Sequence, residues 1–126
     1  MTAYLIVFLG AGIGGALRHG ANLAALRLAG AGFPWGTLAI NVAGSLAMGL
    51  IAGWFALRGA GGGQSLRLFL TTGILGGFTT FSAFSLDTML LWDRGLAMQA
   101  ALYVAGSVLL SIAGVAAGLA AMRVAA

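Results

Sequence analysis

The chain has 126 residues, of which 61% are hydrophobic and 6% are charged, and its formal net charge is +4. Soluble domains carry about 25% charged residues, so this composition excludes a water-exposed globular surface and predicts an integral membrane protein. The arginines lie far apart and form no basic patch, which argues against nucleic-acid binding, and the lack of cysteine excludes disulfides and thiolate metal sites.

Four apolar stretches are long enough to be membrane-spanning helices, each of which needs about 20 residues. They are Tyr4–Leu28, Trp35–Leu57, Leu66–Trp92 and Leu96–Met122. The N-terminus lacks the basic segment of a signal peptide, so we expect the first stretch to be a retained span. The links, at Ala29–Pro34, Arg58–Ser65 and Asp93–Gly95, are short. They predict antiparallel neighbours in a single four-helix transmembrane domain over residues 1–126.

The third stretch contains a segment, Gly73–Ser85, that disfavours a regular helix. It has adjacent glycines at 76 and 77, adjacent threonines at 79 and 80, and three phenylalanines. Glycine costs roughly 1 kcal/mol against alanine in a helix, and threonine hydroxyls compete for backbone carbonyls. We therefore expect the third helix to be broken mid-membrane near Gly76–Thr80. Freed backbone groups must face protein, water or an ion, so the break should lie at an interface or line a path.

Small and polar residues recur at helical spacing in the predicted spans. The glycine pairs are Gly10/Gly14, Gly49/Gly53, Gly73/Gly77 and Gly114/Gly118. This spacing lets helix backbones approach closely, within one chain or between two. The polar stripes are Thr37/Asn41/Ser45 on the second span and Tyr103/Ser107/Ser111 on the fourth. Such stripes either join helices by hydrogen bonds or, beside a broken helix, line a conduit.

The arginines are divided almost evenly between the two ends of the predicted bundle. Arg58, Arg67 and Arg123 fall at the end that holds the N-terminus, whereas Arg18, Arg27 and Arg94 fall at the other. The positive-inside rule then gives almost no orientation bias, so we expect insertion in both directions. Since four helices are few to enclose a polar path, we predict an antiparallel homodimer.

The polar groups in the spans indicate what such a path would carry. Asn41 is the strongest single candidate, because an amide supplies two N–H donors and an acceptor at one place. Phe81 and Phe84 share a helix face, and the edges of aromatic rings are electropositive. This lining suits a small, hard anion. The carbonyls freed at the break suit a cation, which would itself favour anions nearby.

Three segments together resemble the fluoride channel family, Fluc, also called CrcB. They are Gly14–Arg18 (GGALR), Gly36–Asn41 (GTLAIN) and Gly73–Ser85 (GILGGFTTFSAFS). The resemblance covers the first three helices, and the fourth contributes a weaker polar track. It implies an all-α, dual-topology homodimer with two pores. It also implies a multi-pass protein of the bacterial cytoplasmic (inner) membrane that exports fluoride passively.

The resemblance also implies roles for individual residues. Asn41 would hydrogen-bond the permeating fluoride, and Phe81 and Phe84 would present ring edges to it. Backbone carbonyls of Gly76 and Thr79, from both protomers, would hold a structural Na⁺ at the dimer centre. The other residues implied along the pore are Thr37, Thr80, Ser82, Tyr103, Ser107, Ser111 and, in an aqueous vestibule, Arg18.

Three positions depart from the family pattern: His19 stands where an aromatic residue is usual, Ala83 where threonine is common, and Asp87 where glutamate is frequent. Two other functions stay open, a small multidrug-type antiporter and a non-transporting assembly subunit. The first needs a carboxylate in an early span, and the first two spans have none. No nucleophile–base pair, metal cluster or phosphate loop is apparent in the sequence, so we expect no enzymatic activity.

Overall fold

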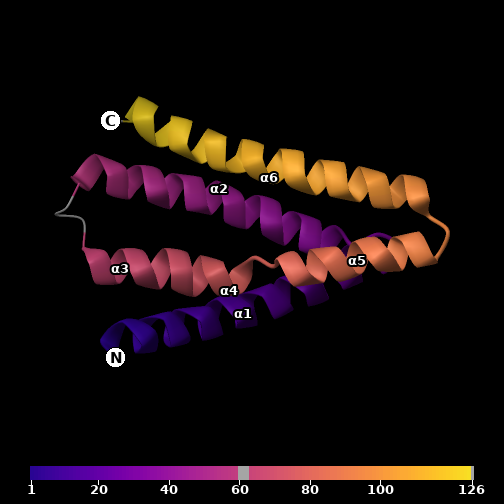
Figure 1. Ribbon diagram of the computed structural model, residues 1–126, viewed down its shortest axis with the longest axis horizontal. Coiled ribbons are helices and arrows are strands. Elements are labelled where there is room, and N and C mark those ends of the chain that lie inside the picture. Colours follow the sequence, from indigo (N-terminus) through magenta and orange to yellow (C-terminus); the bar gives the residue numbers. More distant parts are fainter. Residues whose placement is uncertain (60–62, 126) are drawn as a thin grey trace.

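The computed structural model describes residues 1–59 and 63–125, and these residues are arranged as four long helical spans (Figure 1). The spans are α1 (Thr2–Ala29), α2 (Trp35–Arg58), a segmented third span (Gln64–Asp93) and α6 (Ala97–Ala125). Each is long and apolar enough to cross a membrane. The two termini lie at the same end of the molecule, as an even number of crossings requires. The predicted all-helical, multi-pass membrane architecture is therefore confirmed.

Glycines and the single proline set the turns between the spans. Gly30 ends α1 with φ 76°, and Gly95 has φ 77° in the turn between the third span and α6. Only glycine adopts such angles readily. Pro34 occupies the N-cap of α2, where its missing N–H costs no helical hydrogen bond. The predicted link Arg58–Ser65 lies partly outside the described residues, at 60–62.

The third span consists of four helical segments. They are α3 (Gln64–Leu68), the π-helix η2 (Phe69–Leu75), α4 (Gly76–Phe78) and α5 (Phe81–Asp93). Between α4 and α5 the backbone is extended, with ψ 158° at Thr79 and φ −152° at Thr80. The departure from regular α-helix begins with the π-helix at Phe69, whereas the glycines and threonines predicted it near Gly76–Thr80. In its first turn the Thr71 hydroxyl donates to the Arg67 carbonyl over 2.8 Å, which competes with regular helical bonding.

The helices pack as two pairs, α6 along α2 and α1 along η2 and α4 (Figure 1). Glycines allow both close approaches: a Cβ on Gly10 would lie 2.8 Å from Gly73 Cα, and one on Gly118 would lie 2.6 Å from the Leu46 carbonyl oxygen. Every predicted glycine pair meets another element of the same chain. The sequence left open whether these glycines pack against helices of the same chain or of another chain. The structure shows that they pack against helices of the same chain.

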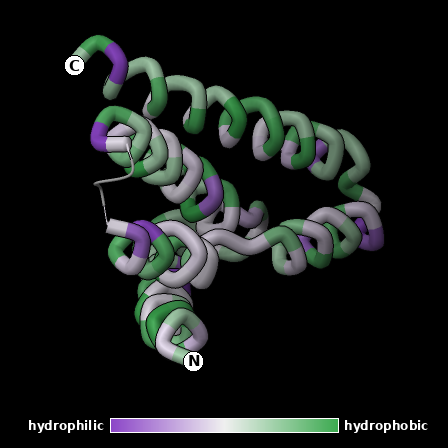
Figure 2. Tube along the Cα trace, turned by 60° about the vertical axis from the view of Figure 1, so that its left-hand side comes forward, coloured by the Kyte–Doolittle hydropathy of each residue, from purple (hydrophilic) through white to green (hydrophobic). Residues whose placement is uncertain are grey.

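Many of the hydrophilic residues lie near the ends of the helices, α6 is largely hydrophobic between its ends, and the middle of the third span is near neutral (Figure 2). The chain buries little of its apolar surface against itself. Its buried hydrophobic cluster contains Phe84, Leu91, Ala100 and Tyr103. The remaining apolar faces are left for lipid or for another protein chain.

Alanine at Gly14 should destabilise the α1–α4 pair. A Cβ there would clash with the Ile74 carbonyl oxygen and lie 2.8 Å from the Phe78 amide nitrogen. Both are backbone atoms that cannot turn away, so we expect a loss of about 1–3 kcal/mol in unfolding free energy. Gly20→Ala is the matched control, because a Cβ on Gly20 meets nothing within 4 Å. Equilibrium unfolding in detergent would compare the two, and equal stabilities would contradict the packing described.

Candidate functional site

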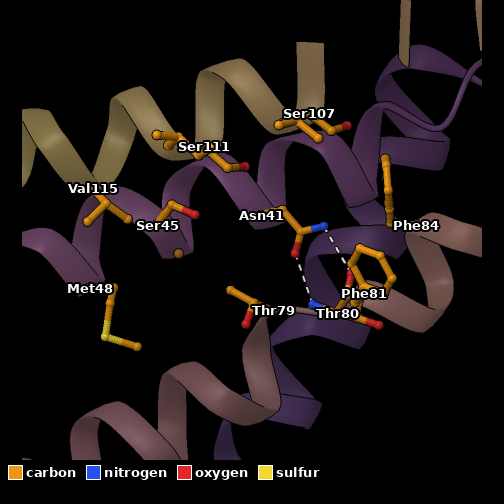
Figure 3. Close-up of a pocket in the computed structure, with 13 residues that line it drawn as sticks. Asn41, Ser45, Met48, Thr79, Thr80, Phe81, Phe84, Ser107, Ser111 and Val115 are labelled. Atoms are coloured by element: carbon orange, nitrogen blue, oxygen red, sulfur yellow. Dashed lines mark hydrogen bonds between the residues drawn. The ribbon is translucent and has the colours of Figure 1, made fainter. Parts of the chain in front are cut away.

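A cavity of about 390 Å³ lies between α2, α6 and the extended residues of the third span (Figure 3). Six of the predicted pore residues line it: Asn41, Thr80, Phe81, Phe84, Ser107 and Ser111. Ser45, the next member of the α2 stripe, lines it as well. We refer to this space as the central pocket. The two polar stripes and the irregular segment of the third span thus meet at one place.

Asn41 joins α2 to the extended backbone of the third span. Its Nδ2 donates to the Thr80 carbonyl over 3.0 Å, and its Oδ1 accepts from the Thr80 amide over 2.9 Å. In a continuous helix the Thr80 amide would bond the Gly76 carbonyl instead. Asn41 therefore replaces helical bonds that the third span has given up, and the two dashed lines of Figure 3 mark this pairing.

Thr80 in turn sets the start of α5. It is the N-cap, and its Oγ1 accepts from the Ala83 amide over 3.2 Å. Phe81 and Phe84 then follow on the first turn, with ring centroids 5.5 Å apart and ring planes at 48°. Phe84 is buried, whereas Phe81 is 78% exposed in the single chain. The pair therefore runs from the protein core to the open side of the pocket.

Ser107 is the most unusual polar group of the pocket. Ser107 is only 5% exposed, and its Oγ has no hydrogen-bond partner among the described residues. Ser111 lies one turn further along the same face of α6 (Figure 3). Buried hydroxyls are nearly always hydrogen-bonded, and leaving one unpaired costs about 1–3 kcal/mol. The site therefore has an unmet hydrogen-bonding capacity that a bound polar species would satisfy.

The other predicted pore residues lie outside the central pocket. Tyr103 is fully buried, and its hydroxyl donates to the Asp87 carboxylate over 3.1 Å. Thr37 is also buried and lines a second cavity together with Asp87. Ser82 is exposed, with its Oγ 3.4 Å from Thr80 Oγ1. The pairing of Tyr103 with Asp87 was not predicted, because nothing in the sequence marks two residues 16 apart on different helices as neighbours.

Arg18 contacts the end of α4 and does not line the central pocket. It is partly buried, and its Nε donates to the Gly77 carbonyl over 3.2 Å. A cation at this end of a helix meets the negative end of the helix dipole. Arg18 thus places a positive charge beside the C-terminal end of α4.

The carbonyls of Gly76 and Thr79 are the two predicted cation ligands. No hydrogen bond to either carbonyl is found among the described residues. By contrast, the Leu75 carbonyl accepts from the Thr79 amide and hydroxyl, and the Gly77 carbonyl accepts from Arg18 Nε. Gly76 is moreover exposed in the single chain. Within residues 1–59 and 63–125 no group of three or more His, Cys, Asp or Glu side chains could hold a metal. Free carbonyl oxygens fit a hard cation such as Na⁺.

Removing the hydroxyl of Tyr103 should lower stability. In Tyr103→Phe the partly buried Asp87 carboxylate loses its phenol donor, which we expect to reduce the unfolding free energy by about 1–3 kcal/mol. Tyr4→Phe is the control, because Tyr4 is 79% exposed. Thermal unfolding of both variants in the same detergent would test this. A Tyr103→Phe protein as stable as the control would show that the bond contributes nothing.

Taken together, the fold and the pocket define a small multi-pass helical membrane protein with a polar pocket beside the extended residues 79 and 80. The chain matches the family described as "CrcB-like protein, Camphor Resistance (CrcB)" over residues 5–119. It belongs to that family, and the resemblance seen in its motifs is confirmed.

Relatives with established names cover almost the whole chain. One, from Methylobacterium nodulans (strain LMG 21967 / CNCM I-2342 / ORS 2060), is 68% identical over 98% of both chains and is named "Fluoride-specific ion channel FluC". Another with the same name, from Methylobacterium sp. (strain 4-46), is 66% identical over 98% of both chains. A third, from Rhodopseudomonas palustris (strain BisB5), is 61% identical over 95% of this chain and 96% of its own. All three names are those of ion channels, a class of protein distinct from enzymes.

Proposed function

We propose that the chain is a fluoride-selective ion channel that lets F⁻ leave the bacterial cytoplasm passively across the cytoplasmic (inner) membrane. The observation that carries this proposal is the buried Ser107 Oγ in the central pocket, which has no hydrogen-bond partner in the part of the chain that the structure describes. The pocket lies beside the Asn41 amide and the Phe81 and Phe84 rings. The names of the close relatives support the same function.

The physical task of such a channel is to replace the water around a small anion. Desolvating an ion is very costly unless hydrogen bonds compensate for it. Ser107 and Ser111 can each donate an O–H, and Asn41 retains one N–H beyond its bond to Thr80. The electropositive edges of Phe81 and Phe84 would complete the lining without supplying an anionic group. Because the smallest halide forms the strongest hydrogen bonds, a lining of such donors would favour fluoride over larger halides.

The assembly that we propose is an antiparallel, dual-topology homodimer of single four-helix units. Phe81, Ser82 and Gly76 are all exposed in the single chain although they lie within a membrane span. Polar and irregular backbone at that depth is tolerated only against protein or in a wet cavity. A second, inverted copy would cover these residues and close the open side of the central pocket.

We also propose that Gly76 and Thr79 carbonyls of both protomers hold a structural Na⁺. Both carbonyls lack backbone partners in the described part of the chain, and Gly76 is accessible to a second copy. The ion would supply fixed positive charge near the anion pocket and a link between protomers. Arg18, bound to the intervening Gly77 carbonyl, would add to the same positive field.

Anion efflux from liposomes tests the proposed function. Vesicles that contain the purified protein and are loaded with KF, with a little Na⁺ on both sides, should release F⁻ rapidly when a K⁺ ionophore lets K⁺ leave with it, whereas KCl-loaded vesicles should retain Cl⁻. Fluoride and chloride electrodes measure the two rates. Chloride release as fast as fluoride release would contradict selectivity, and no release of either ion would favour the assembly-subunit alternative.

A further inference from the structure

Asn41 uses its side chain in a way that an anion ligand alone would not require. Its amide forms a two-bond pairing with the backbone of Thr80, one bond of 3.0 Å and one of 2.9 Å (Figure 3). An amide group has two N–H donors and one acceptor oxygen. One donor and the oxygen are therefore committed to the third span, and only one N–H remains for any bound species.

The pairing also fixes the direction of the carbonyl of the residue before Thr80. A peptide bond is planar, and in the trans form its C=O and N–H point in opposite directions. No cis peptide bond is present among the described residues. The Thr80 N–H and the Thr79 C=O belong to one peptide group. Because Asn41 on α2 holds the N–H, the Thr79 carbonyl must point away from Asn41.

The same pairing anchors the start of α5. Thr80 is held at both its amide and its carbonyl, and its hydroxyl caps α5 by accepting from Ala83. Phe81 is the next residue of the chain, and Phe84 lies one turn further on. A shift of Thr80 would therefore move both aromatic rings as well as the Thr79 carbonyl.

We infer that Asn41 is a positioning residue that couples the anion pocket to the cation site through the Thr79–Thr80 peptide group. The inference rests on the proposed function for the identity of the two ions. The geometry of the coupling is independent of that function. Through one side chain, Asn41 sets both the orientation of a proposed Na⁺ ligand and the location of the two rings. Occupancy of one site then affects the geometry of the other.

Hydrogen exchange at the Thr80 amide tests the coupling directly. Nuclear magnetic resonance of the full-length protein in detergent should show a slowly exchanging Thr80 amide in the wild type. In Asn41→Ser, whose shorter side chain cannot make both bonds, exchange should be about tenfold faster. In Asn41→Leu, which has a similar shape but no polar group, the increase should be similar. Ser111→Ala is the matched control, because Ser111 lines the same pocket from α6 and has no hydrogen bond to the third span among the described residues.

Sodium dependence is the second measurement. Titration with NaCl at constant ionic strength, followed by the chemical shift of the Thr79 carbonyl carbon, should give a half-saturation about fivefold or more higher in Asn41→Ser than in the wild type. Ser111→Ala should titrate like the wild type. A merely structural defect would lower helix content in circular dichroism and disturb the spectrum as a whole, and we expect neither.

The outcomes separate the coupling from the proposed function. A rapidly exchanging Thr80 amide in the wild type would overturn the coupling, even if both Asn41 variants failed to fold. Unchanged Thr80 exchange and unchanged Na⁺ titration in a folded Asn41 variant would also overturn it, leaving Asn41 as an anion ligand only. Failure of the channel function would appear instead as absent fluoride efflux from the wild type, with Thr80 exchange still dependent on Asn41.

Discussion

Replacement of Phe81 by isoleucine should slow fluoride efflux by about tenfold or more, which corresponds to roughly 1.4 kcal/mol in the barrier to permeation. Isoleucine keeps much of the apolar volume and removes the electropositive ring edge. The lost interaction would act on the anion while it is least hydrated, so we expect a slower rate with little change in protein abundance. Liposome efflux with a fluoride electrode measures the effect, and growth of a fluoride-sensitive strain reports it in cells.

Phe81 is a cleaner test than Phe84. Phe84 is packed in the buried cluster with Leu91, Ala100 and Tyr103, so a smaller side chain there would leave a cavity and lower stability as well. Phe81 is 78% exposed in the single chain, and its removal leaves that cluster intact.

Phe8→Ile is the matched control for this prediction. Phe8 is also highly exposed, at 74%, but it lies on α1 away from the residues that line the central pocket. Its replacement should leave efflux unchanged. If Phe81→Ile conducted fluoride within about twofold of the wild type, the ring edge would not contribute to the barrier. The pocket would then have to work through Asn41 and the serines alone.

The sequence predicted the helical spans because hydropathy alone determines them in a membrane protein. Nearly uninterrupted apolar residues leave few alternatives to helices that satisfy their own backbone. Pro34, Gly30 and Gly95 then mark the ends of helices through local backbone preferences. The predicted boundaries are accurate because these signals act over a few residues. The π-helix at Phe69–Leu75 had no comparable signal, since Thr71 and its neighbours also occur in regular helices.

The sequence could predict which residues form the candidate site but not which groups they contact. Spacing of four places Asn41 and Ser45 on one face of α2 and Ser107 and Ser111 on one face of α6. The partner of each side chain depends on packing between segments far apart in the chain. Asn41 bonds a residue 39 positions away. The sequence therefore identified Asn41 as important but indicated only an anion contact. The structure shows that its Oδ1 and one of its two N–H groups bond the backbone of Thr80.

Exchanging sodium for a bulky organic cation should separate the proposed dimer. The Gly76 and Thr79 carbonyls would then lie at a protein interface without a partner, and an unpaired buried polar group costs roughly 2–7 kcal/mol. We expect the dissociation constant of the protomers to rise by about a hundredfold or more when N-methylglucamine replaces Na⁺ at the same ionic strength. Fluorescence energy transfer between labelled protomers in detergent measures this.

A side-chain variant distinguishes a backbone carbonyl ligand at Thr79 from a hydroxyl ligand at the same residue. The Thr79 hydroxyl donates to the Leu75 carbonyl over 2.9 Å, so it is engaged with the helical turn that precedes it. Thr79→Val keeps the shape and the backbone carbonyl but removes that hydroxyl, and it should keep the sodium dependence of the dimer. Loss of sodium dependence in Thr79→Val would assign the ligand to the side chain. Equal dimerisation of the wild type in both cations would show that the free carbonyls are satisfied in the assembly without a metal ion.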